Sequence, residues 1–124
     1  MTIRRLEILQ WLGFLAGGTI WFAEFIVGVG ASEAVCNPAS SRWGIPHDTL
    51  QIVLLVVAAA AVCCAEAASV LVFRSARDAE QQGPPPHARM KFFAIGAMAG
   101  NLIFLTIILL SGIATISDQL CHQA

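Results

Sequence analysis

The stretch "FFAIGAMAGNLIFLTIILLSGIATIS", residues 92–117, contains no charged side chain. A helix needs about 20 consecutive apolar residues to cross a hydrocarbon core that is about 30 Å thick. Because each helical residue advances by about 1.5 Å, this stretch is long enough to cross the core completely. It therefore predicts a transmembrane helix.

Two further blocks, residues 11–31 and 49–73, have a similar length and character. The chain of 124 residues is 57% hydrophobic and 12% charged, with a mean hydropathy of +0.74, whereas soluble domains are about 45–50% apolar and about 25% charged. We predict an all-α membrane protein with one domain, residues 1–124. The predicted helices are 9–31, 49–74 and 91–117, with an outer loop at 32–48 and a cytoplasmic linker at 75–90.

The first block has an alternative interpretation as a cleaved signal peptide, with "MTIRR" as its basic start and Val29-Gly30-Ala31 as a cleavage site. The apolar run, however, is longer than the about 7–15 residues of a signal-peptide core. It also contains Glu24. We expect this block to be retained as a transmembrane helix.

Lysine and arginine are placed asymmetrically about the three blocks. The first outer loop contains only Arg42, whereas the N-terminus and the second connection contain the other six: Arg4, Arg5, Arg74, Arg77, Arg89 and Lys91. Basic residues favour the cytoplasmic side of a membrane. We therefore predict a multi-pass protein of a bacterial plasma membrane, with a cytoplasmic N-terminus and an outer C-terminus. The net charge of −1 gives no basic surface of the kind that binds nucleic acid.

The four cysteines fall into two pairs on this topology. Cys36 and Cys121 both lie on the predicted outer side, where thiols are normally oxidised, and we predict a disulfide between them. Cys63 and Cys64 lie within the second helix. We interpret these two as small packing residues.

Small residues at a spacing of four occur in the first and third helices, as Gly13-x-x-x-Gly17 and Gly96-x-x-x-Gly100. Such pairs allow helix backbones to approach closely in lipid. The two motifs have similar predicted depths, and the two helices run in the same direction. We predict a parallel contact between them through these glycines. The alternative is that each motif faces a different partner protein.

Three polar residues, Glu24, Glu66 and Asn101, lie within the apolar blocks. Helical periodicity places Glu24 on one face with Gly13, Gly17, Trp21 and Gly28, so its side chain is expected in a protein contact. No lysine or arginine lies inside the three apolar blocks. Since an unpaired carboxylate is costly in hydrocarbon, we expect Glu24 to be neutral and to donate to a carbonyl or to Asn101, unless a partner subunit supplies a cation.

Two interpretations of these groups remain open. Polar side chains between membrane helices fix their packing, whereas an ionisable residue inside a membrane is also a candidate proton site. Glu66 lies nearer the membrane surface, where it could be hydrated or approach Arg74.

Other chemistry is not favoured by the sequence. The three histidines, His47, His87 and His122, lie outside the predicted spans, so haem ligation within the membrane is not expected. A metal site at Cys36, His47, Cys121 and His122 is an alternative by ligand type, although the predicted disulfide uses the same cysteines. We predict no enzyme activity, no metal and no cofactor.

The layout resembles small three-helix proteins that accompany bacterial haem-copper oxidases and related respiratory complexes. The shared features are Trp21 and Glu24 in a Trp-x-x-polar step, Cys36 soon after it, Arg89 before the third helix, and "LIFLTIILLSGIATISDQLC", which ends at Cys121. Glu24 replaces the histidine or amide of that step. The resemblance implies an accessory, non-catalytic subunit, in contact with other membrane subunits and lipid, that stabilises an oxidase or helps to assemble it.

Two alternatives belong to other classes. "WFAEF", residues 21–25, is similar to the first helix of small multidrug-resistance transporters, a family with four spans in which a membrane glutamate exchanges protons for drugs. This similarity implies an oligomeric proton-coupled transporter. The third hypothesis is an assembly factor that binds copper through the outer cysteines.

Overall fold

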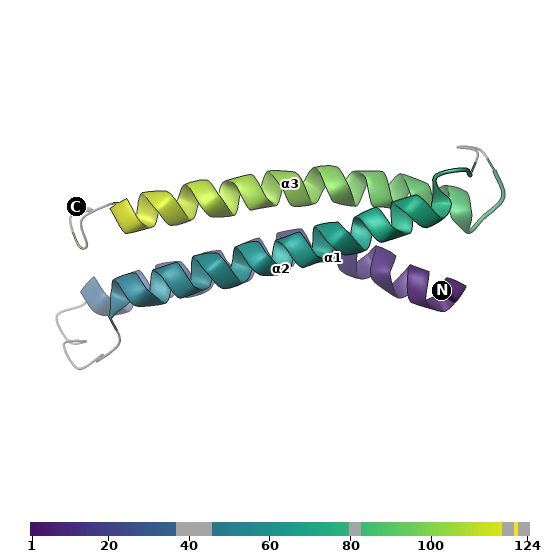
Figure 1. Ribbon diagram of the computed structural model, residues 1–124. Coiled ribbons are helices and arrows are strands. Elements are labelled where there is room, and N and C mark those ends of the chain that lie inside the picture. Colours follow the sequence, from purple (N-terminus) through teal and green to yellow (C-terminus); the bar gives the residue numbers. More distant parts are fainter. Residues whose placement is uncertain (37–45, 80–82, 118–120, 122–124) are drawn as a thin grey trace.

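The computed structural model is a bundle of three long helices (Figure 1). Helix α1 spans Ile3–Cys36, α2 spans His47–Ala76 and α3 spans His87–Ser117. The structure describes residues 1–36, 46–79, 83–117 and 121. All three helices are long and apolar enough to cross a membrane. The predicted all-α class with three membrane-spanning helices agrees with this arrangement.

The helices extend beyond most of their predicted limits, which followed the apolar blocks. Helix α1 begins six residues earlier than position 9 and continues past 31 to Cys36. The backbone hydrogen bonds of a helix join residues of the same segment, so a helix can continue beyond the hydrocarbon. The predicted outer loop and linker are correspondingly shorter, because α2 begins at His47 and ends at Ala76.

The connection between α2 and α3 has its own stabilising contacts. Proline has no amide donor and therefore suits the start of a helix. At the start of α3, the Met90 amide donates a hydrogen bond to the Pro86 carbonyl, 3.0 Å away. The Lys91 ammonium donates to the carbonyls of Arg77 and Ala79, at 2.8 and 2.9 Å. These contacts satisfy carbonyls after the end of α2 that have no partner within the helix.

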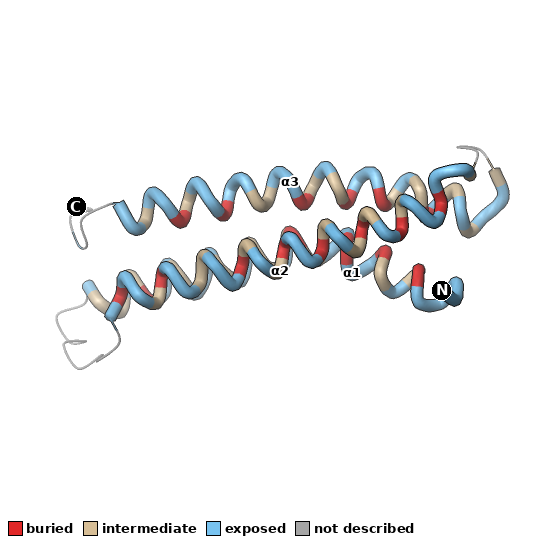
Figure 2. The backbone as a smooth tube through the Cα atoms, in the orientation of Figure 1, coloured by how far each residue is buried: buried red, intermediate tan, exposed pale blue. Residues whose placement is uncertain are grey.

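Buried residues form stripes along the inward sides of the helices (Figure 2). We call the end with the N-terminus and the α2–α3 connection the basic end, and the opposite end the disulfide end. One apolar cluster lies near the basic end and consists of Leu6, Val72, Ala76, Met90 and Ala94. A second lies farther along, with Ala58, Val62 and Ile108 buried at its centre. Together they make the bundle core.

The two glycine motifs behave differently in the bundle. A side chain at Gly13 would collide with Ser69 of α2, and one at Gly17 would collide with Asn101 of α3. A Cβ at Gly100 would meet nothing within 4 Å, and one at Gly96 would meet only Phe14, at 3.8 Å. The predicted contact through both motifs was therefore wrong, since only the motif in α1 lies at a close helix contact.

Aromatic rings fill the α1–α3 contact instead. The Phe93 ring lies 5.5 Å from that of Trp11 and 5.3 Å from that of Phe14, centroid to centroid. Farther along, Trp21 lies 5.8 Å from Phe104. These are typical distances for favourable aromatic pairs. Rings of this size separate the backbones, so α3 has no need of glycine on this side.

Candidate functional site

A polar contact joins all three helices in the half of the bundle nearer the basic end. The side chain of Asn101 in α3 is only 2% exposed. Its amide nitrogen donates to the Gly13 carbonyl of α1 at 3.0 Å and to the Ser69 hydroxyl of α2 at 3.4 Å. The Ser69 hydroxyl in turn donates to Ala65 at 2.9 Å. We call Gly13, Ser69 and Asn101 the three-helix contact.

Gln10 lies one turn before Gly13 on the buried stripe of α1. It is 2% exposed, yet neither its amide nitrogen nor its amide oxygen has a hydrogen-bond partner within the described residues. An unsatisfied buried polar group costs about 1–3 kcal/mol. Gln10 is therefore a strained feature of the core, and sequence reasoning overlooked it.

Glu24 lies on the predicted face of α1 but not beside Asn101. The Asn101 amide is bonded at Gly13, about 16 Å from Glu24 along the helix at 1.5 Å per residue. Glu24 itself is only partly buried. No described hydrogen bond or ion pair reaches its carboxyl. The expected contact with Asn101 was wrong. Counting residues from Trp11 and from Lys91 placed Glu24 and Asn101 at similar depths, but the Asn101 amide lies at the level of Gly13.

Glu66 is partly buried in α2. Its Oε2 atom is buried and has no hydrogen-bond partner among the described residues. The alternative of an approach to Arg74 is not seen, since no ion pair among the described residues joins them. Cys63 and Cys64 are free and exposed on the outside of the bundle. The predicted packing role of these small side chains is therefore not one in the core of this bundle.

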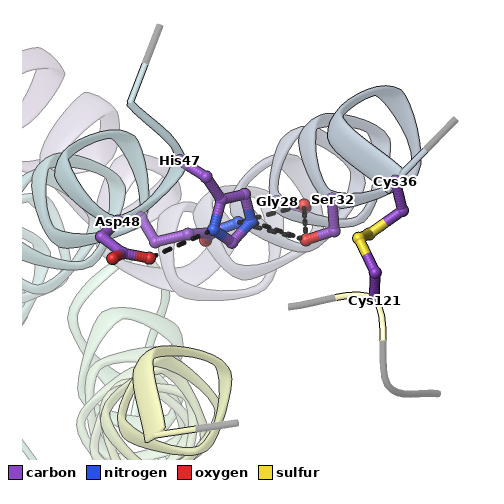
Figure 3. Close-up of a disulfide and its surroundings, with 7 residues drawn as sticks. Gly28, Ser32, Cys36, His47, Asp48 and Cys121 are labelled. Carbon is purple, nitrogen blue, oxygen red and sulfur yellow. Dashed lines mark hydrogen bonds and ion pairs between the residues drawn. A yellow bond between two sulfur atoms is a disulfide. The ribbon is translucent and has the colours of Figure 1, made fainter. Parts of the chain in front are cut away.

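A second polar group lies where α1 ends and α2 begins, at the disulfide end (Figure 3). His47 Nε2 lies 3.0 Å from the Ser32 hydroxyl and 3.2 Å from the Gln51 amide nitrogen. Gln51 also donates to the Gly28 carbonyl at 3.1 Å. We call Gly28, Ser32, His47 and Gln51 the histidine cluster. Its contacts join α1 to α2.

The hydrogen-bond partners define the roles of the His47 nitrogens. The Gly28 carbonyl can only accept a hydrogen bond, so the Gln51 side-chain atom bonded to it is the amide nitrogen. An amide nitrogen can only donate. Nε2 therefore accepts from Gln51, and the ring proton lies on Nδ1. That atom faces Asp48 Oδ1 at 3.5 Å, longer than an ordinary hydrogen bond. The ring is neutral in this arrangement.

Ser32, His47 and Asp48 are the residue types of a nucleophilic triad, with the histidine between the serine and the aspartate. Their contacts, however, favour a structural role. The Ser32 hydroxyl donates to the Gly28 carbonyl of its own helix at 3.0 Å. The Asp48 side chain is 77% exposed. The proton of Ser32 is thus directed to a carbonyl, and His47 Nε2 is occupied by Gln51. We interpret the cluster as a contact between helices.

The disulfide joins Cys36 at the end of α1 to Cys121 after α3, as the topology predicts (Figure 3). Their Cα atoms lie 5.4 Å apart, and 85 positions separate them in sequence. Ser32, Gln51 and Ser69 were overlooked at the sequence level, and His47 was considered only as a metal ligand. The signal was available, because His47, Gln51, Ala58, Val62, Ala65 and Ser69 recur at helical spacing along the buried side of α2.

The described residues contain no group of three or more histidine, cysteine or acidic side chains that could hold a metal ion. In the alternative metal site of the sequence, Cys36 and Cys121 are joined as a disulfide, and His122 lies outside the described residues. Comparison with family models, with curated proteins and with solved structures gave no match to this chain.

Proposed function

We propose that the protein is an accessory, non-catalytic subunit of a larger bacterial plasma-membrane complex, held to neighbouring helices through Glu24. One observation carries this proposal. The Glu24 carboxyl is only partly buried, lies well inside the span of α1, and has no hydrogen bond or ion pair within the described chain. Lipid chains offer no polar partner, so a group at this depth requires one from protein. A helix of another subunit would supply it.

The orientation that we propose follows from charge and oxidation. Arginine and lysine concentrate at the basic end, which favours the cytoplasm. The Cys36–Cys121 disulfide lies at the other end, where an oxidising exterior would preserve it. Both features support the same topology.

The resemblance to small proteins that accompany haem-copper oxidases leads us to propose a respiratory complex as the partner. In this role the bundle would contribute to the stability or assembly of the complex. The disulfide and the buried polar contacts suit such a role, because they fix α1, which carries Glu24, relative to the other two helices.

An oligomeric proton-coupled transporter is the second candidate, and it rests on the same incompletely buried carboxyl. Within a single bundle, Val62 and Ile108 are 1% and 0% exposed. They belong to the apolar cluster that lies between the three-helix contact and the histidine cluster. A proton path would therefore have to run between copies of the chain. Copper binding through Cys36 and Cys121 would first require reduction of their disulfide.

The test is purification in mild detergent from the native membrane, comparing the unmodified protein with Glu24→Leu and Glu24→Gln. Glu33→Gln is the matched control, because Glu33 is exposed on the same helix. We expect haem-containing subunits to co-purify with the protein in fixed ratio. A membrane hydrogen bond contributes about 0.6–1.7 kcal/mol, so Glu24→Leu should weaken partner recovery about three- to eighteenfold. Glu24→Gln should retain part of it.

Two outcomes would contradict the proposal. Partner recovery that is equal in Glu24→Leu and Glu33→Gln would remove Glu24 from the interface. A homo-oligomer without other subunits, in which Glu24→Gln abolishes drug-driven proton release, would establish the transporter instead.

A further inference from the structure

A shallow groove of about 530 Å³ runs along the outward side of α1 near the basic end. It is lined by Arg4, Glu7, Ile8, Trp11, Leu12 and Leu15. These positions recur at helical spacing on one side of α1, whereas Leu6, Gln10 and Gly13 form the buried stripe. The groove is therefore open to the surroundings of the bundle, although Trp11 and Glu7 at its edge also contact Phe93 and Arg89 of α3.

The polarity of the groove changes in one direction along the helix. Arg4 lies at the end nearer the N-terminus, Trp11 in the middle, and Leu15 farthest into the span. The distance from Arg4 to Leu15 is about 16 Å at 1.5 Å per residue, close to half of a hydrocarbon core about 30 Å thick. From the N-terminal end inward, a cation, an aromatic ring and an apolar side chain thus lie at the depths of the head group, the glycerol backbone and the acyl chains of one lipid molecule.

Three of the six arginine and lysine side chains at the basic end have partners among the described residues. Arg89 pairs with Glu7 at 3.1 Å, Arg77 pairs with Asp78 at 3.6 Å, and Lys91 donates to two backbone carbonyls. The first of these pairs neutralises the only carboxylate that lines the groove. Among the described residues, no carboxylate lies within ion-pair distance of Arg4. Its charge is therefore available to an anion from outside the chain.

We propose that this groove binds one anionic phospholipid. Arg4 binds the phosphate, Trp11 lies at the level of the glycerol backbone, and one acyl chain packs along Leu12 and Leu15. The lipid occupies the outward side of α1, so this site is independent of the contacts proposed for Glu24. Arginine suits phosphate because its planar group offers several donors.

The experiment measures quenching of Trp11 fluorescence in vesicles. Trp21→Phe and Trp43→Phe leave Trp11 as the only tryptophan, and brominated phosphatidylglycerol or brominated phosphatidylcholine serves as the quencher. One basic residue near an anionic lipid surface contributes about 1 kcal/mol, so we expect an about fivefold preference for phosphatidylglycerol at Trp11. A protein that retains only Trp21 should show no such preference.

Charge variants then locate the site. Arg4→Gln should abolish the preference, whereas Arg4→Lys should retain most of it. Arg74→Gln is the matched control, because Arg74 is an exposed cation at the same end on α2; it should have no effect. Circular dichroism verifies that each variant keeps its helices. Equal quenching by both lipids, or a preference that survives Arg4→Gln, would overturn the proposal.

Discussion

The three-helix contact and the histidine cluster hold the bundle together in different ways. In the three-helix contact, one asparagine amide reaches a carbonyl of α1 and a hydroxyl of α2, so a single side chain connects all three helices. In the histidine cluster, the hydrogen bond from Gln51 to the Gly28 carbonyl connects only α1 and α2. There the disulfide from Cys36 to Cys121 connects α1 to the segment after α3.

The difference follows from depth. Far from water, an unpaired polar group is costly, so the few polar groups present must satisfy one another across the helices. At the end of the bundle, water can replace a lost hydrogen bond, and α3 is joined by a covalent link instead. The contacts of Asn101 should therefore be more sensitive to substitution than those of Gln51, whereas loss of the disulfide should exceed both.

The largest effect is expected for the disulfide. Replacing Cys36 and Cys121 together by serine should lower the free energy of unfolding by about 2–4 kcal/mol, because the bridge closes a long loop in the unfolded chain. Reversible unfolding in sodium dodecyl sulfate measures the change. Cys63→Ser with Cys64→Ser is the matched control, since both thiols are free and exposed. A loss of similar size in the control would contradict this assignment.

Steric change at the three-helix contact comes next. Gly13→Leu should destabilise the bundle by about 1–3 kcal/mol, the usual cost of forcing a side chain into a packed site, because its Cβ would collide with Ser69. Gly100→Leu should change stability by less than about 0.5 kcal/mol, since a Cβ there meets nothing within 4 Å. Equal losses in the two variants would show that α3 also packs through its glycine motif.

Hydrogen bonding at the two sites can be compared directly. Asn101→Leu should cost about 1 kcal/mol, within the range for bonds between membrane helices. Gln51→Leu should cost about half as much, because water near the membrane surface can bond the freed Gly28 carbonyl. Unfolding of the two variants under the same conditions provides the comparison. A larger loss for Gln51→Leu would reverse the proposed dependence on depth.

One substitution should raise stability and not lower it. Gln10→Met keeps nearly the same shape and removes two buried amide atoms that have no described partner. It should stabilise the bundle by about 1 kcal/mol, since leaving such groups unsatisfied costs about 1–3 kcal/mol. The same unfolding measurement tests the sign. Destabilisation by Gln10→Met would show that the amide has a polar partner in the membrane.

Much of the fold could be predicted from local features of the chain. The uncharged residues 92–117 are long enough to span a membrane, and their backbone groups must be bonded within the helix. The placement of Cys36 and Cys121 at one end follows from three crossings. The periodicity of α1 also placed Glu24 on the side of Gly13 and Gly17, where the structure has it.

The contacts of the polar residues could not be predicted in the same way. A depth estimate along separate helices put Asn101 near Glu24, whereas its amide lies at Gly13. The unpaired atoms of Gln10 and the bond from Gln51 to Gly28 depend on how two helices are rotated and shifted against each other. Helical periodicity within one segment contains no information on that shift.

By itself, the sequence determined three apolar helices and their alternating directions, because length and hydrophobicity act within each segment. Only the tertiary structure decided which side of α3 faces inward. Ala97 and Asn101 are buried there, while Gly96 is exposed and Gly100 has open space beside it. The rings of Phe93 and Phe104 occupy the α1–α3 contact. Rotation of a helix is set by the shapes of the side chains opposite it, and these meet only in the packed bundle.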